Sequence, residues 1–206
     1  MNYTIKLIDY NINEDIINHR LNICDKDFTT IIFANRFNNP INNVDFPNQI
    51  KKIVFGKLFN QVLDKIKFPN DLEELYFGDN FNQEIFLVKF PENIKVIRFG
   101  YNFNQLVDNI IFPESLEILE FGYEFNQSLK NIQINSNSKI ILNGISLKSL
   151  ENLPNNLKYL EIYNIKEPLK NLPITLEKIF CKYCTNNILE KSKIPFNCSL
   201  VINKIE

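Results

Sequence analysis

The sequence of 206 residues has little of what enzymes and metalloproteins commonly use: it contains no tryptophan, one histidine, four cysteines and five glycines. The single histidine, His19, has no recurring acidic or nucleophilic neighbour. This argues against a Ser-His-Asp or Cys-His catalytic arrangement and favours a plain surface or cap histidine. No glycine-rich phosphate-binding loop occurs either. We therefore predict no catalytic residue and no cofactor.

The chain also lacks an excess of charge of either sign. Its 23 Lys and Arg against 24 Asp and Glu give a net charge of −1, whereas nucleic-acid binding needs a concentrated basic surface. The N-terminus has neither the basic start nor the apolar stretch of a secretory signal. No segment approaches the roughly 20 apolar residues of a membrane-spanning helix. These absences predict a soluble, cytoplasmic protein that binds neither nucleic acid nor membranes.

What the chain does contain is a repeat. The unit Phe-Gly-x-x-Phe-Asn-Gln begins at Phe55, Phe77, Phe99 and Phe121, a spacing of 22 residues. A fixed period of about 20 to 50 residues indicates a solenoid. Hydrophobic residues make up 45% of the chain and alternate with asparagine at a fixed phase, which indicates a packed core rather than disorder.

Each repeat also carries a strand-like frame, Leu-x-x-Leu-x-Phe, in which apolar and outward residues alternate. This frame is close to that of leucine-rich repeats. It can be placed nine times: at Phe28/Ile31/Phe33, Ile50/Ile53/Phe55, Leu72/Leu75/Phe77, Ile94/Ile97/Phe99, Leu116/Leu119/Phe121, Ser138/Ile141/Asn143, Leu157/Leu160/Ile162, Leu176/Ile179/Cys181 and Cys198/Val201/Asn203. We predict a mainly all-β solenoid of about nine turns with one parallel sheet, regular to residue 134 and degenerate after it.

The return side of each turn is expected to be extended or 3₁₀, not α-helical. Its motif is apolar-x-apolar-Pro, as at residues 66–69, which is too short for a helix, and proline removes a backbone donor. Residues 1–24 are expected to cap the first turn, with a short helix over residues 13–21. Residues 25–206 are expected to form the solenoid.

The asparagine of Phe-Asn-Gln follows an inward phenylalanine where the chain leaves the strand. It recurs at Asn38, Asn60, Asn82, Asn104 and Asn126. We hypothesise a stacked ladder whose amides bond loop backbone groups within and between turns, since an unpaired buried amide costs roughly 1–3 kcal/mol. The alternative is an exposed asparagine that merely suits a turn.

The combination of Phe-Gly-x-x-Phe-Asn-Gln with apolar-x-Phe-Pro resembles the FNIP repeat, a leucine-rich-repeat-like unit abundant in slime moulds and in giant viruses that infect amoebae. Residues 55–69, 77–91, 99–113 and the segment from Phe121 carry the resemblance. It implies an interaction scaffold, in the host cytoplasm if the protein is viral. Several relatives carry an F-box ahead of the repeats, but residues 1–24 are too short for that helical module, so a ubiquitin-ligase link stays open.

The cysteines allow a metal site or a disulfide, because Cys181 and Cys184 lie close to Cys198 in the sequence and Cys24 could join them. However, Cys181 falls in the frame position of Phe121, and Cys198 falls in that of Leu116. Both are most simply small core residues, since free cysteine is commonly buried. We predict no metal site.

The outward positions of the strands differ in character. The first column, Lys51, Glu73, Lys95, Glu117 and Lys139, alternates in sign from turn to turn. Stacked strands place such side chains about 5 Å apart, so we predict an intramolecular charge ladder, each exposed pair contributing about 0–1 kcal/mol.

The next columns change toward apolar residues rimmed by charge, which is typical of a binding surface. The predicted partner-binding residues are Val96, Arg98, Ile118, Glu120, Ile140, Leu142, Tyr159 and Glu161. The alternatives are that β-branched residues simply suit strands, or that a loop or terminus covers them.

The expected function is a non-catalytic scaffold that presents its sheet to a protein partner of unknown identity. The last strand has an exposed edge, which would favour a homodimer. Two other functions stay open: a carbohydrate-processing β-solenoid enzyme, which would need converging carboxylates in a groove, and a structural component that assembles through its edges.

Overall fold

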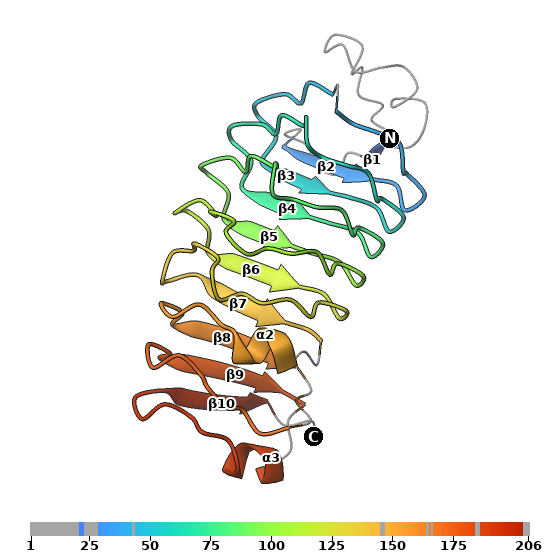
Figure 1. Ribbon diagram of the computed structural model, residues 1–206. Coiled ribbons are helices and arrows are strands. Elements are labelled where there is room, and N and C mark those ends of the chain that lie inside the picture. Colours follow the sequence, from blue (N-terminus) through green and yellow to red (C-terminus); the bar gives the residue numbers. More distant parts are fainter. Residues whose placement is uncertain are drawn as a thin grey trace.

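One sheet runs along the whole coil in the computed structural model, which describes residues 21–22, 29–42, 44–144, 147–163, 165, 167–183 and 186–203 (Figure 1). Within these residues the sheet has ten strands in sequence order. They are β1 (Leu21–Asn22), β2 (Thr30–Phe33), β3 (Lys52–Val54), β4 (Glu74–Tyr76), β5 (Val96–Arg98), β6 (Ile118–Phe121), β7 (Lys139–Leu142), β8 (Tyr159–Tyr163), β9 (Lys178–Lys182) and β10 (Ser199–Asn203). Strands β2 to β10 are all parallel, so the predicted parallel solenoid is confirmed, with about eight full turns joining nine strands.

The sheet begins with a strand that the repeat does not predict. Strand β1 pairs antiparallel with β2, so that Leu21 lies opposite Phe33 and Asn22 opposite Ile32. Apart from Leu21, which is in β1, the predicted helix over residues 13–21 lies outside the described residues.

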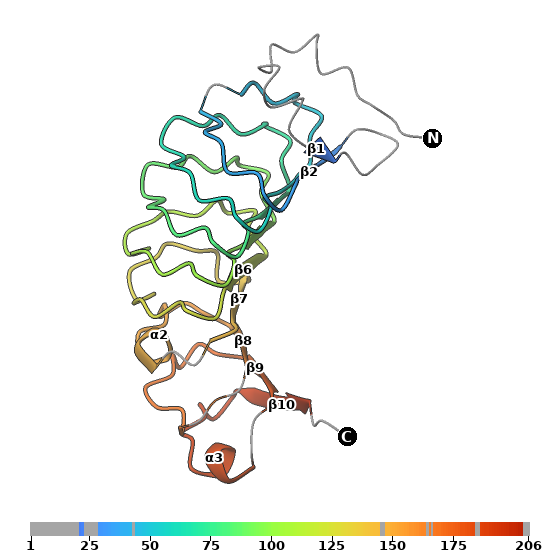
Figure 2. The same ribbon diagram turned by 90° about the vertical axis from the view of Figure 1, so that its right-hand side faces the viewer.

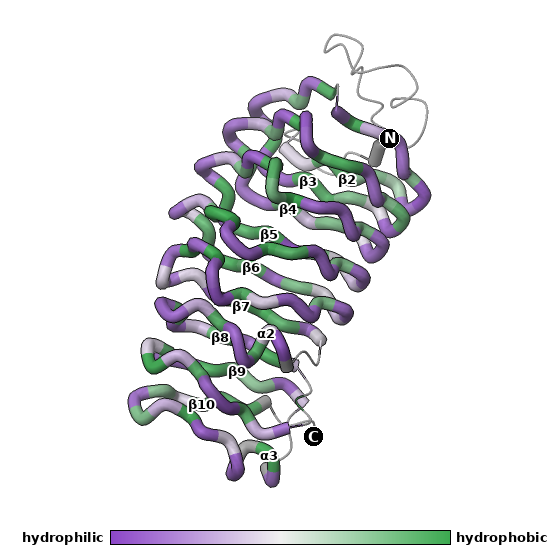
Figure 3. The backbone as a smooth tube through the Cα atoms, in the orientation of Figure 1, coloured by the Kyte–Doolittle hydropathy of each residue, from purple (hydrophilic) through white to green (hydrophobic). Residues whose placement is uncertain are grey.

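Two columns of phenylalanine rings fill the core of the regular turns. The rings of Phe33, Phe55, Phe77, Phe99 and Phe121 follow one another at 5.1 to 5.5 Å. The second column, Phe37, Phe59, Phe81, Phe103 and Phe125, has spacings of 6.0 to 6.1 Å. Apolar residues therefore recur at the same place in each turn (Figure 3), and one turn can bury its aromatic faces only against its neighbours.

The glycine of the repeat is required by the closeness of successive turns. A Cβ atom at Gly78 would lie 1.9 Å from the carbonyl oxygen of Gly56, and one at Gly100 would lie 2.1 Å from that of Gly78. None of the glycines has a positive φ. Only a residue without a side chain lets the backbones approach this closely.

The return side is extended through the regular turns, as expected, but not throughout. Within the described residues two short α-helices occur, α2 (Leu147–Glu151) and α3 (Asn186–Glu190). Helix α2 lies where the Phe-Asn-Gln bend stands in the previous turn, since the Ser149 hydroxyl donates to the Gln127 carbonyl at 2.7 Å. Among the described residues, no helix has the length and apolar character needed to cross a membrane.

The strand register differs from the predicted frames in two turns. In β7, Ile140 pairs with Leu119 and Leu142 with Phe121, so Ile140 and Leu142 face the core, where they are 0% and 2% exposed. The predicted frame had Ile141 and Asn143 inward. The step from β6 to β7 is 21 residues, and a shift of one residue turns every side chain to the other face.

The last strand repeats this difference. Leu200 pairs with Ile179 and Ile202 with Cys181, so Leu200 and Ile202 point inward where the frame had predicted Val201 and Asn203. Both of these turns contain three consecutive apolar residues, for which alternation alone cannot fix the register. The observed choice places two apolar side chains inward instead of one apolar side chain and one amide, whose burial without partners is costly.

Candidate interaction surface

The outward side of strands β2 to β10, which we call the sheet face, lines the concave side of the curved coil (Figure 2). Strand pairing fixes its columns. One column contains Lys52, Glu74, Val96, Ile118, Lys139, Tyr159 and Lys178, and the next contains Val54, Tyr76, Arg98, Glu120, Ile141, Glu161 and Phe180. Side chains in one column are about 5 Å apart and can interact directly.

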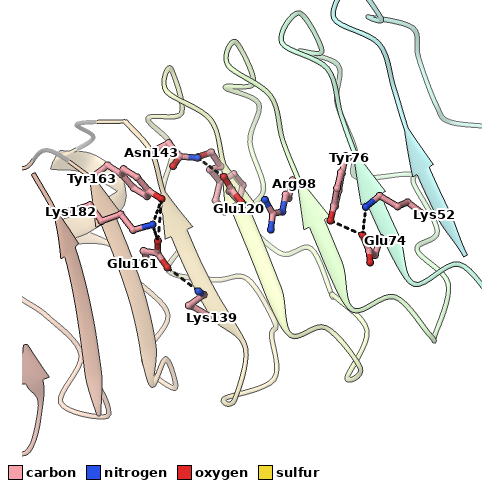
Figure 4. Close-up of polar contacts among 11 residues, drawn as sticks. Lys52, Glu74, Tyr76, Arg98, Glu120, Lys139, Asn143, Glu161, Tyr163 and Lys182 are labelled. Carbon is pink, nitrogen blue, oxygen red and sulfur yellow. Dashed lines mark hydrogen bonds and ion pairs between the residues drawn. The ribbon is translucent and has the colours of Figure 1, made fainter. Parts of the chain in front are cut away.

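A first polar group, the Glu74 group, lies on β3 to β5 (Figure 4). The Glu74 carboxylate accepts a hydrogen bond from the Tyr76 hydroxyl at 2.6 Å and lies 2.8 Å from the Lys52 ammonium. The Lys52 and Arg98 cations lie 4.4 and 5.1 Å from the centre of the Tyr76 ring. Burial alone would raise the pKa of Glu74, but the bonds from Lys52 and Tyr76 outweigh it and lower that pKa.

A second polar group, the Glu161 group, lies on β7 to β9. The Glu161 carboxylate pairs with Lys182 at 2.7 Å and with Lys139 at 2.9 Å, and it accepts a hydrogen bond from the Tyr163 hydroxyl at 3.2 Å (Figure 4). Its residue is only 7% exposed. Burial would raise the pKa of Glu161, but hydrogen bonds from Lys182 and Lys139 lower it, while the bonds to Glu161 and Tyr163 raise the pKa of Lys182.

Glu120 lies between the two groups. It pairs with Arg98 at 3.3 Å, and its carboxylate accepts a hydrogen bond from the Asn143 side-chain amide at 2.8 Å. Asn143 therefore lies at the edge of the sheet face. The predicted frame had placed it in the core, and that placement is wrong.

The first outward column forms part of the predicted charge ladder. Glu73 pairs with Lys51 at 3.1 Å and with Lys95 at 2.6 Å, and hydrogen bonds from Lys95 and Lys51 lower the pKa of Glu73. Lys139 does not continue this column, because the shorter turn moves it beside Ile118. It belongs to the Glu161 group instead.

The predicted partner-binding residues are divided between the sheet face and the core. Six of them, Val96, Arg98, Ile118, Glu120, Tyr159 and Glu161, lie on the sheet face. The expected exposure of Ile140 and Leu142 is wrong, since both are in the core. Ile141 takes the outward place, yet it is 6% exposed and separate from the main core cluster. Lys139 lies between Ile118 and Tyr159 in their column, so the predicted apolar stripe is interrupted there.

Sequence reasoning missed the distribution of tyrosine. Of the six tyrosines among the described residues, three lie in strands of the sheet and three lie within three residues of the end of a strand: Tyr76, Tyr159 and Tyr163, and Tyr101, Tyr123 and Tyr183. The rings of Tyr101 and Tyr123 stack 5.2 Å apart while remaining 46% and 45% exposed. Laying the tyrosines out in the repeat register would have revealed the pattern.

The repeated asparagines form hydrogen bonds from one turn to the next, at the bend that follows each strand. The side-chain oxygens of Asn38, Asn60, Asn82 and Asn104 accept the backbone N–H of the next asparagine, ending at Asn126, at 2.8 to 2.9 Å. Each oxygen also accepts a hydrogen bond from the side-chain amide of the glutamine in the next turn, as from Gln105 to Asn82 at 3.0 Å. The contribution of this ladder to stability remains a prediction.

The cysteines within the described residues lie in or beside the core. Cys181 is buried and continues the column of Phe121 through Leu142 and Ile162. Cys198 is half-buried, and burial raises the pKa of its thiol. No group of three potential metal ligands occurs among the residues that the structure describes. His19, Cys24 and Cys184 lie outside them.

Comparison with known proteins gives one family. The model of the FNIP repeat matches residues 37–80 and 81–124. Each match covers two turns of the coil, and the boundary falls directly before Phe81 of the second phenylalanine column. A search of curated proteins found no match to this chain.

Proposed function

We propose, from the premise that this chain is an FNIP-repeat protein, that it is a non-catalytic scaffold that presents its sheet face to a protein partner. The observation that carries the proposal is the gathering of tyrosine on one side of the coil. Tyrosine is enriched in protein interfaces, where its ring supplies contact area and its hydroxyl supplies a hydrogen bond. The surrounding ion pairs would form the polar rim of such an interface.

The predicted residues that face outward keep their place in this proposal. Val96 and Ile118 are half-buried neighbours on β5 and β6, and Tyr159 lies two strands further along the column. Arg98, Glu120 and Glu161 flank them. The proposal places the protein in the cytoplasm, a compartment that keeps thiols such as Cys181 reduced.

The carbohydrate-processing alternative is less well supported by the carboxylates of the sheet face. A glycosidase needs a carboxylic acid whose pKa is raised so that it can donate a proton. The pKa values of Glu74 and Glu161 are instead lowered by their cationic and phenolic partners. These carboxylates are suited to structure and recognition.

Affinity capture with matched surface variants tests the proposal. The sheet-face variant carries Val96→Asp and Ile118→Asp. The control carries Phe86→Asp and Leu106→Asp, which replace 65% and 69% exposed residues away from the sheet. We expect the wild-type protein to capture a partner from extracts of the producing cells. The control variant should capture the same partner, and the sheet-face variant should not. Loss in the control alone would place the interface on the return side and contradict the proposal.

Self-assembly is separated by a second measurement. A homodimer or a structural component would show a mass that rises with protein concentration in light scattering. A constant monomer mass, together with face-dependent capture, favours the scaffold.

A further inference from the structure

The sheet face is electrostatically uneven along the coil. On β3 to β6 and at the residues directly before them, the outward charges balance in number: the cations are Lys51, Lys52, Lys95 and Arg98, and the anions are Glu73, Glu74, Glu117 and Glu120. On β7 to β9 and at the residues directly before them, the cations are Lys139, Lys158, Lys178 and Lys182, against only Glu161 and Glu177. This second region, which we call the basic end, has a net charge of +2, although the whole chain has −1.

One cation of the basic end pairs with no carboxylate in the part of the chain that the structure describes. Lys139 and Lys182 share Glu161, and Lys158 pairs with Glu177 at 3.1 Å. Among the described residues, no carboxylate lies within salt-bridge distance of Lys178. Its ammonium instead lies 4.8 Å from the centre of the Phe180 ring. An aromatic ring and an ammonium are therefore presented together, as an anchor and a charge for an incoming group.

From these observations we propose that the basic end binds an extended acidic segment of a partner protein. The inference rests on the proposed function and names the chemistry of the partner. Because Glu161 and Glu177 stand among the lysines, closely spaced phosphates would be repelled, whereas carboxylates spaced more widely can each reach a lysine. Charge complementarity thus favours an acidic peptide over nucleic acid.

The strand geometry sets the spacing of the acids. Lys139 and Lys178 lie in one column, two strands apart, so their Cα atoms are separated by about 10 Å. A segment in polyproline II conformation rises about 3.1 Å per residue, so residues three apart are separated by about 9 Å. A chain running along the coil axis with an acid at every third position would therefore meet both lysines.

A fluorescein-labelled peptide of four Glu-Pro-Ala repeats is the probe. Its fluorescence anisotropy is measured with the full chain at low ionic strength, where surface charge is least screened. We expect saturable binding whose affinity falls as salt is added. We expect Lys178→Glu to lower the affinity for the peptide by about tenfold or more. Lys67→Glu, an exposed change away from the sheet with the same effect on net charge, should leave the affinity within about twofold.

A second variant, a folding check and a nucleic-acid competitor complete the experiment. Lys178→Gln removes the charge without reversing it and should give a smaller loss, and circular dichroism with thermal unfolding checks that each variant is folded. Absence of wild-type binding, an equal loss in Lys67→Glu, or tighter binding of an oligouridylate of the same length would each overturn the acidic partner. Face-dependent capture without peptide binding would refute this inference and leave the proposed scaffold standing.

Discussion

The turns of β3 to β6 and those of β7 to β10 share one sheet but differ in core and surface. In the regular turns, phenylalanine stacks on phenylalanine, and the sheet face carries as many cations as carboxylates. In the degenerate turns the same core column continues through Leu142, Ile162 and Cys181. The strand ladder thus holds the register even where the core residue changes. The excess of lysine over glutamate on the sheet face is found where the core repeat has loosened.

The two regions also close their turns differently. The asparagine ladder ends at Asn126, after β6, and the last closely approaching glycine is Gly144, after β7. Helix α2 then replaces the Phe-Asn-Gln bend. The Leu129 N–H donates to the Asn152 carbonyl at 2.9 Å, so the last regular turn is bonded to the first helical one. The two bend types can stand next to each other in one coil because each forms hydrogen bonds with backbone groups of the adjoining turn.

The largest expected difference lies in the core columns. Phe103→Ala removes a ring that is 0% exposed and that stacks on Phe81 and Phe125. We expect a loss of about 3–5 kcal/mol in the free energy of unfolding, measured by chemical denaturation. Cys181→Ala, in the degenerate turns, removes one sulfur atom and should cost much less. Equal losses would show that the aromatic columns contribute no special stability.

Gly100→Ala is expected to cost about 1–3 kcal/mol. The added Cβ would meet the Gly78 carbonyl oxygen at 2.1 Å, so the backbones of two turns must separate. Denaturant unfolding measures the loss, with Tyr101→Ala as the neighbouring control on an exposed side chain. A variant as stable as wild type would mean that the turns can separate freely at this place.

Asn82→Leu tests the ladder and should destabilise by about 1–3 kcal/mol. The change removes the oxygen that accepts the Asn104 N–H at 2.9 Å and the Gln105 amide at 3.0 Å. Asn82→Asp keeps an acceptor in the same place and is expected to retain most of the stability. If thermal unfolding were the same for Asn82→Leu and wild type, the ladder would be structurally irrelevant.

The smallest effect concerns the carboxylates of the two regions. Because the folded-state pKa of Glu161 lies below the ordinary value of 4.5, its charge stabilises the fold above that value, and this contribution is lost as pH falls through the lowered pKa. Glu161→Gln should therefore be less stable than wild type at neutral pH, and the gap should close in acid. Glu73→Gln, on the exposed ladder, should show a smaller gap that salt screens. A gap for Glu161→Gln that is independent of pH would contradict the assignment.

The sequence predicted the fold well because its main signals are local and repeated. The spacing of Phe55 and Phe77 gives the period, and Leu75-Tyr76-Phe77 gives the strand alternation. The failures came where several apolar residues are consecutive, as at Ile140-Ile141-Leu142. The inward position of Asn143 in the predicted frame was the warning sign, since an amide there would lack partners in an apolar core.

The sequence by itself determined the coil, its period, the parallel sheet and the inward phenylalanines, because a 22-residue repeat can bury its apolar side chains only by stacking on itself. The tertiary structure decided which residues share the sheet face. A one-residue shorter turn moved Lys139 from the charge ladder to Glu161 and moved Ile140 and Leu142 into the core. Which cations of the sheet face meet which carboxylates depends on strand pairing between residues about twenty positions apart, and the lengths of the intervening turns set that pairing.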